Sequence, residues 1–485
     1  MFLSIVLSAI SGVLYYLSFP PVALNFLIWF FLLPIFFACG ALRKRGEKVL
    51  CGFAAGITGF GLNLYWIFFT VRSVGENFAI SLAAVLIPAI FFSLFASVFT
   101  ALSEEKPVTL AATGSLLAWL GAKIPVGMPW CALYVSQAKS PVFLQITRIT
   151  GPHFLTFLIL FVNASLYRSI RKRKIKIMIP ALAMFLFTAL YGALAMKGLS
   201  ASVGAEAREI SVVQLNVSQD EKWDSLKANE IMSDIRRFIQ SEKESRIIVF
   251  PESCLPGIVN FDEYINEFLN EISLKTRQTI LLGAAFYKAR KLYNSALIIN
   301  GSGKDKYYFK RRLVPFGEFV PFRRFLGRFV SVINELGDFT AGDKPAILET
   351  GRVRIAPLIC SESVYPSLWR GGGNMRVNIS NDAWYGETSA AEQHLWHGIC
   401  AASSCGVPLI FANNTGPSAI INERGVVTAE SPYGSAVVLR GSVYVPVRAS
   451  FYAEHFDIAL PALFLILIIR SAVYLKNIMG GNVDG

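Results

Sequence analysis

Long apolar runs fill most of the first 200 residues, and one more lies near the C-terminus. The first run has no basic residues before it and is followed by further runs, so we expect it to be a retained helix and not a cleaved signal peptide. About eight segments are long enough to span, or nearly span, a bilayer: residues 2–19, 22–42, 49–71, 78–101, 108–124, 152–169, 177–196 and 456–475.

The pattern changes between residues 208 and 448, where short β-type runs alternate with polar, helix-like stretches. This alternation predicts a layered α/β domain, so we expect a membrane domain over 1–200, a water-soluble α/β domain over 208–448 and a last membrane helix over 455–477. The expected strands are Ile210–Leu215, Ile247–Phe250, Thr279–Ala284, Asn294–Ile299, Val353–Cys360, Val377–Ser380, Leu409–Ala412 and Ser418–Ile421, and the expected helices are Lys227–Ser241, Phe261–Thr276 and Ala391–Cys405.

The composition supports a membrane protein, since 54% of the residues are hydrophobic and only 16% are charged. The net charge of +13 is concentrated in loops, chiefly at 43–48 and 168–176. Basic loops stay on the cytoplasmic side, which predicts cytoplasmic termini and an outward-facing segment over 197–454. Because no nucleic-acid-binding motif accompanies the charge, we expect no nucleic-acid partner.

The cysteines and histidines do not form a recognisable metal site. The seven cysteines include no CxxC pair, and His394 and His397 have i,i+3 spacing without clear further ligands. We therefore expect no metal, and we interpret Cys400 and Cys405 as helix-packing residues.

Three reactive side chains stand near the ends of apolar runs. Glu252 follows one predicted strand, Cys360 ends another, and Lys310 lies between them in the sequence. A thiol can attack a carbonyl, a carboxylate can move the proton, and an ammonium can stabilise the oxyanion, so the set suits acyl transfer. Cys254 is the rival nucleophile.

The motifs around these residues resemble those of the nitrilase superfamily, namely 251–253, Lys310 with its flanking residues, and 359–362. The segments 313–318, 378–386 and 413–416 narrow the resemblance to the apolipoprotein N-acyltransferase family of the bacterial inner membrane. That resemblance covers nearly the whole chain.

The resemblance implies eight membrane helices and an αββα sandwich that carries a Glu-Lys-Cys triad. Cys360 is then the nucleophile, Glu252 the general base and Lys310 the oxyanion stabiliser, with the Ser361 N–H as a second donor. Supporting roles fall to Glu318 and Glu362, and Trp223 matches a tryptophan near the lipid pocket.

The resemblance also implies the substrates. The acyl donor is a phospholipid, typically phosphatidylethanolamine, and the acceptor is the N-terminal amine of an S-diacylglyceryl-cysteine lipoprotein. No cofactor is needed, and we expect a monomer with its catalytic domain on the periplasmic side.

Two departures from the family pattern bear on the details. Ser361 stands where many members have an aromatic residue, and Ile399, Ala401 and Ser404 replace charged residues of a helix. Two other functions remain open: a membrane-anchored amidase or nitrilase with water as second nucleophile, and a transporter or lipid-binding protein that has kept only the fold.

Two segments are candidates for lipid contact. The loop 125–150 is either an interfacial connection or a wall of a lipid cavity. The segment 319–330 combines four Phe with three Arg, so it is either a packed basic helix or a membrane-seated arm, in which Phe322 and Phe325 contact acyl chains.

Overall fold

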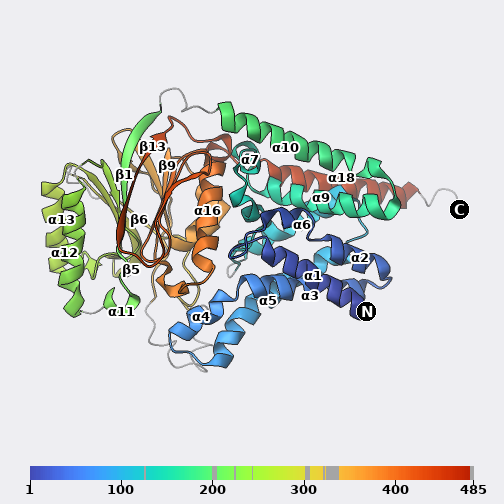
Figure 1. Cartoon of the computed structure of the whole chain (residues 1–485), viewed down its shortest axis with the longest axis horizontal. Coiled ribbons are helices and arrows are strands. Elements are labelled where there is room, and N and C mark those ends of the chain that lie inside the picture. Colours follow the sequence, from blue (N-terminus) through green and yellow to red (C-terminus); the bar gives the residue numbers. More distant parts are fainter. Residues whose placement is uncertain are drawn as a thin grey trace. The chain divides into compact units, whose positions relative to one another are not determined.

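The computed structural model describes residues 1–124, 127–198, 205–222, 225–242, 244–300, 306–320, 323 and 338–480. The chain forms two compact units (Figure 1). The first unit comprises Met1–Leu199, Thr388–Trp396 and His455–Gly485, and the second comprises Ser200–Glu387 and His397–Glu454. The domain boundaries expected from the sequence, at residues 200, 208, 448 and 455, remain predictions.

The first unit is helical. Among the described residues, three helices (α5, α9 and α10) are long and apolar enough to cross a membrane, and the bent pair of α3 and α4 supplies a fourth candidate. Residues 2–17, 25–41 and 459–473 are apolar but shorter. The main helices are α1 (Phe2–Leu17), α2 (Leu33–Ala41), α3 (Arg45–Asn63), α4 (Trp66–Ser73), α5 (Phe78–Ala101), α6 (Pro107–Lys123), α9 (His153–Lys172), α10 (Ile179–Gly198) and α18 (Ala459–Gly480).

Two predicted membrane segments are not continuous helices. The segment 22–42 divides into a 3-10 helix at Asn25–Trp29 and α2. The Asn163 side chain of α9 serves this break, since it accepts the Leu32 N–H at 3.0 Å and donates to the Ile28 carbonyl at 3.0 Å. The segment 49–71 bends by 49° between α3 and α4. Backbone groups freed by a break in apolar surroundings need such side-chain partners.

Small residues bring the first helices together. A Cβ at Gly12 of α1 would lie 2.5 Å from the carbonyl oxygen of Ala55 in α3. A Cβ at Gly56 of α3 would lie 2.6 Å from the Ser93 Cα in α5. Glycine at these positions permits the close backbone contact that drives helix association in lipid, where apolar side chains alone supply little driving force.

The second unit contains two mixed sheets. The first has the strand order β13-β1-β2-β4-β5-β6, with β3 paired to β4, and the second has the order β12-β11-β10-β9-β8-β7. The strands of the first sheet are β1 (Glu206–Gln214), β2 (Ile247–Val249), β3 (Ile258–Val259), β4 (Thr279–Lys288), β5 (Lys291–Ile299), β6 (Lys306–Phe309) and β13 (Val437–Val445). Those of the second are β7 (Leu348–Thr350), β8 (Val353–Ile359), β9 (Met375–Ser380), β10 (Leu409–Asn413), β11 (Ala419–Ile421) and β12 (Val427–Glu430).

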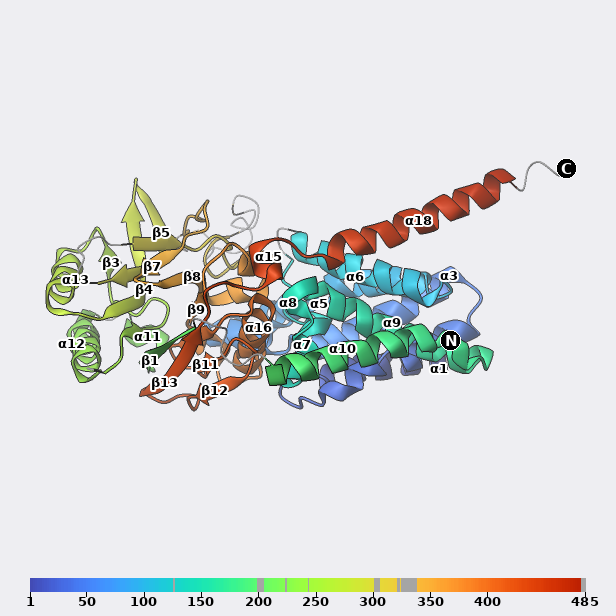
Figure 2. The same ribbon diagram turned by 90° about the horizontal axis from the view of Figure 1, so that it is seen from above.

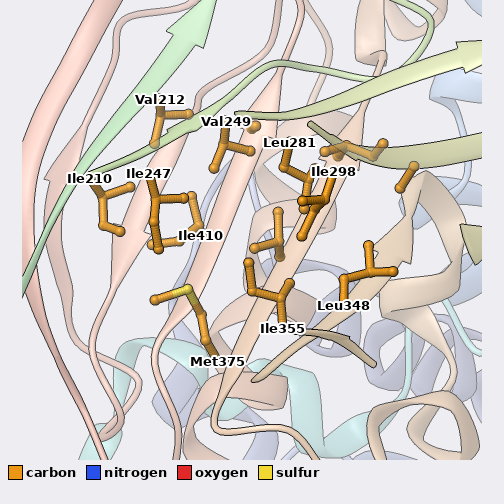
Figure 3. Close-up of a cluster of buried hydrophobic side chains, with 14 of the residues drawn as sticks. Ile210, Val212, Ile247, Val249, Leu281, Ile298, Leu348, Ile355, Met375 and Ile410 are labelled. Atoms are coloured by element: carbon orange, nitrogen blue, oxygen red, sulfur yellow. The ribbon is translucent and has the colours of Figure 1, made fainter. Parts of the chain in front are cut away.

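Strand alternation builds two apolar layers. Ile247 and Val249 of β2 join the cluster between the sheets, while Ile248 belongs to the cluster under α12 (Ser225–Ser241) and α13 (Glu263–Lys275). Figure 3 shows side chains of both sheets meeting in the first cluster, among them Ile210 and Ile410. On the second sheet, Gly398 of α16 (Ala390–Cys405) lies against Phe411 of β10. The predicted αββα sandwich is therefore confirmed.

The three residues of α16 that depart from the family pattern lie in the core. Ile399, Ala401 and Ser404 are all buried. On β9 the buried Arg376 donates from Nη1 to the Gly372 carbonyl at 2.5 Å and lies beside the Cys405 thiol, but its Nε has no hydrogen-bond acceptor among the described residues. Beyond Glu392 the helix offers no carboxylate, so this buried guanidinium lacks a counter-ion from α16.

Candidate active site

Glu252 lies on a tight turn after β2. Ser253 has a φ of +50°, and the turn packs on β4 at a glycine, where a Cβ would come within 2.6 Å of the Glu252 Cα. The Gly283 N–H donates to the Pro251 carbonyl at 3.1 Å. The carboxylate is thus fixed at the carboxyl end of β2, buried to 6% exposure.

Lys310 follows β6, which runs parallel to β4 because each pairs antiparallel with β5. Its side chain is 1% exposed, and its ammonium lies 2.8 Å from Glu318 Oε2 and 3.4 Å from Glu252 Oε1. The Asn294 amide bridges the two acids, donating at 2.7 Å to an oxygen of each. The two carboxylates, the amide and the ammonium therefore form one buried network.

Cys360 is the first residue after β8 and begins a 3-10 helix, Cys360–Val364. The expectation that the strand includes Cys360 was wrong by one residue. Its φ is +51°, a left-handed conformation that L-residues seldom adopt and that recurs at functional sites. The strand ends because the chain turns sharply at this residue.

Glu362 ties the Cys360 turn to the segment after Lys310. Its carboxylate accepts the Ile359 N–H at 2.9 Å, the Arg311 N–H at 2.7 Å and the Tyr308 hydroxyl at 2.8 Å. Burial raises the pKa of this carboxyl, although these donors oppose the shift. Glu362 therefore fixes the Cys360 turn against the segment that follows Lys310.

The electrostatics of the thiol and the ammonium are coupled. Burial disfavours the Lys310 ammonium, but the carboxylates of Glu318 and Glu252 outweigh that cost and raise the pKa of Lys310 well above its usual range. Burial, followed by the charge of Glu252, raises the pKa of the Cys360 thiol, and Lys310 opposes this shift. At neutral pH the site thus holds a protonated thiol beside a charged lysine.

Sequence reasoning missed three neighbours of this network. Asn294 bridges the acids, the Tyr385 hydroxyl hydrogen-bonds with the Cys360 thiol, and the buried Lys222 donates to the Glu252 carbonyl at 3.3 Å. Burial lowers the pKa of Lys222 to about 8. Asn294 was detectable as a polar residue at the start of a buried strand, and Tyr385 lies within a recognised motif segment, but no sequence pattern singles out Lys222.

The rival residues are placed elsewhere. The buried Cys254 thiol donates to the Gly283 carbonyl at 3.3 Å within the apolar cluster under α12 and α13, and burial raises its pKa to about 12. No group of three His, Cys, Asp or Glu side chains in the described part of the chain is arranged to hold a metal ion. Trp223, Phe322 and Phe325 lie outside the described residues, so their lipid-binding roles remain predictions.

The comparisons with known proteins agree with this architecture. Residues 209–443 match the carbon-nitrogen hydrolase family, the class of protein that the paired sheets and the buried Glu, Lys and Cys side chains define. Residues 11–165 match the apolipoprotein N-acyltransferase N-terminal domain.

Similar proteins extend the match over nearly the whole chain. The apolipoprotein N-acyltransferase of Geobacter metallireducens is 31% identical, with 93% of this chain and 91% of that protein covered. The protein of the same name from Caulobacter vibrioides is 29% identical, with 89% and 86% covered. The chain belongs to the apolipoprotein N-acyltransferase family. The predicted class, a membrane protein with acyltransferase activity, is therefore confirmed.

Proposed function

We propose that this protein transfers a fatty acyl chain from a phospholipid to the N-terminal amine of S-diacylglyceryl-cysteine lipoproteins. The observation that carries the proposal is the buried network in which Lys310 contacts Glu252 and Glu318. The charges of all three side chains act on the Cys360 thiol. Family membership supports the acyl-transfer chemistry, and the apolar helices suit a substrate held in a bilayer.

In the first half-reaction the Cys360 sulfur attacks the ester carbonyl of the phospholipid, and Glu252 takes the thiol proton. The tetrahedral oxyanion is stabilised by the Lys310 ammonium and the Ser361 N–H. When the intermediate collapses, the C–O bond breaks, Glu252 returns the proton to the leaving alkoxide, and a lysophospholipid departs. A thioester remains on Cys360.

In the second half-reaction the lipoprotein amine attacks the thioester. Glu252 accepts a proton from the amine, the C–S bond breaks, and the proton returns to the Cys360 sulfur. The acyl group is already activated as an ester in the phospholipid, so no nucleotide is needed to drive its transfer to the amine. The scheme has ping-pong order.

The raised pKa of the Cys360 thiol fits this order of events. A thiolate that existed before substrate arrived would sit beside the carboxylate of Glu252, and the two like charges would repel each other. The proton therefore leaves the sulfur as the carbonyl is attacked, when the developing negative charge moves to the oxyanion near Lys310.

We also propose a bacterial inner-membrane location, with cytoplasmic termini and the catalytic domain on the periplasmic side. The basic loops at 43–48 and 168–176 support this orientation. The donor is expected to be phosphatidylethanolamine and the protein a monomer. Reporter fusions at residue 174 should score as cytoplasmic, and fusions at residue 200 as exported.

Intact-protein mass spectrometry after incubation with phosphatidylethanolamine tests the chemistry. We expect an added acyl mass that hydroxylamine removes, that is absent in Cys360→Ala and that persists in the matched control Cys254→Ala. An acyl group that remains in Cys360→Ala would overturn the assignment. Release of the acyl group by water as fast as by a diacylated lipopeptide would instead identify a hydrolase.

A further inference from the structure

A groove of about 620 Å³ follows α9 within the first unit. Helices α6, α10 and α18 pack against α9, and Figure 2 shows where these helices run. Residues of all three helices line the groove together with α9. The stripe that α9 contributes is Phe154, Phe157, Phe161 and Ser165, a spacing that places all four on one helix face. The groove is almost wholly apolar.

The length of the groove matches one leaflet of a bilayer. From Phe154 to Ser165 the helix rises by roughly 16 Å at 1.5 Å per residue. Half of the hydrocarbon core is about 15 Å. An acyl chain that enters at the Ser165 end can therefore lie along the whole stripe.

A basic residue stands at one end of the groove. Lys106 contributes to the lining and is exposed. The acids that precede it are engaged elsewhere, since Glu104 pairs with Lys48 at 2.5 Å and Glu105 pairs with Arg470 at 3.2 Å. Within the described residues the Lys106 ammonium has no ion-pair partner.

Two helix N-termini reinforce this positive end. Lys106 is the N-cap of α6, which has no side-chain cap and no acidic residue in its first turn. Helix α10 also has no acidic residue in its first turn, and its Pro180 lines the same groove. A cation at a helix N-terminus is unfavourable unless an anion compensates it, and helix N-termini favour phosphate.

We propose that this groove binds one anionic phospholipid, with an acyl chain along the α9 stripe and the phosphate at Lys106. An anionic headgroup suits the site better than a zwitterionic one, because Lys106 and the two helix N-termini add only positive potential. This binding proposal stands whether or not the acyl-transfer proposal holds.

Native mass spectrometry of the full-length Cys360→Ala protein, which cannot consume a donor at that thiol, tests the headgroup. With phosphatidylglycerol and phosphatidylcholine in competition, we expect one tightly retained phosphatidylglycerol. Lys106→Gln should weaken its retention about fivefold, since one lysine near a membrane surface contributes about 1 kcal/mol. Lys106→Arg should keep the preference, and so should Lys123→Gln, the matched control at the other end of α6.

A second pair of variants tests the acyl-chain part of the site. Ala462→Trp places an indole in the groove and should remove the retained lipid, whereas Leu465→Trp, on an exposed part of α18 outside the lining, should not. Retention of the phosphatidylglycerol preference in Lys106→Gln would overturn the proposed phosphate contact. Retention of the lipid in Ala462→Trp would overturn the groove as its site.

Discussion

Replacing Glu318 with Gln tests whether the lysine of the site depends on a second carboxylate. Glu318 Oε2 lies 2.8 Å from the Lys310 ammonium, closer than Glu252 Oε1 at 3.4 Å, and both side chains are buried. Glutamine keeps the shape but removes the charge, and its single amide oxygen can take over only one of the two bonds that the separate carboxylate oxygens accept from Asn294 and from the Val314 N–H. The buried Lys310 ammonium then keeps Glu252 as its neighbouring counter-ion.

The expected loss follows from the strength of a charge-assisted hydrogen bond. Such a bond contributes about 1.5–3 kcal/mol, which corresponds to roughly 10- to 150-fold in rate if it is fully expressed in the transition state. Without Glu318, the Lys310 ammonium pairs more strongly with Glu252, and this makes the Glu252 carboxylate a weaker proton acceptor. We therefore expect acyl-enzyme formation to slow by at least tenfold.

The pH dependence should change in a defined direction. The raised pKa of Lys310, which Glu318 and Glu252 sustain against burial, keeps the ammonium charged at every pH below that value. Its stabilising contribution is complete below the pKa of the unfolded chain and disappears as the pH rises through the higher folded-state pKa. In Glu318→Gln the folded-state pKa falls, so the alkaline limb of the rate profile should move to lower pH.

The assay is the rate of hydroxylamine-sensitive acyl mass gain from phosphatidylethanolamine, measured across pH. Glu349→Gln, which changes an exposed acid of the same domain, is the matched control and should behave as wild type. A Glu318→Gln rate within threefold of wild type, with an unmoved alkaline limb, would refute the reasoning and leave Glu252 as the only counter-ion that matters.

Three further variants probe the rest of the domain. Acyl-enzyme formation in the Glu252→Ala/Lys310→Ala double variant should be hardly slower than in either single variant, because groups that share a transition state are not additive; losses that multiply would argue against one shared site. Tyr308→Phe removes a buried donor to Glu362 and should cost about 1.5–3 kcal/mol of stability, read as a lower thermal midpoint. Arg376→Met should leave stability unchanged or raise it, since the buried guanidinium has unmet hydrogen bonds, and a large loss would mean that an acceptor compensates it.

Periodicity predicted the second unit well because its strands are short, apolar and bounded by polar turns. All eight expected strands occur, but β3, β6, β7, β12 and β13 were not expected. The last two carry exposed residues that break the apolar pattern, for example Glu430 and Tyr444. Such strands are defined by their pairing partners, which are distant in the sequence.

The site was predictable only as far as its motifs extended. Glu252, Lys310 and Cys360 were named from strand ends and motif resemblance, and the structure brings them together, although their catalytic roles await the experiments above. Asn294 and Lys222 act through tertiary contacts with the Glu252 turn. Hydropathy likewise could not reveal the break within residues 22–42, because the backbone groups freed there are hydrogen-bonded by the Asn163 side chain, which is distant in the sequence.

The left-handed backbone at Cys360 limits which nucleophile this site can use. With φ at +51°, a side chain with one substituent on Cβ beyond hydrogen is tolerated, whereas a β-branched side chain meets severe crowding. Serine could therefore occupy the position without moving the chain, but threonine, a nucleophile in other enzymes, could not. The turn that follows β8 therefore restricts which nucleophilic side chains can carry the acyl group at this position, whatever their reactivity.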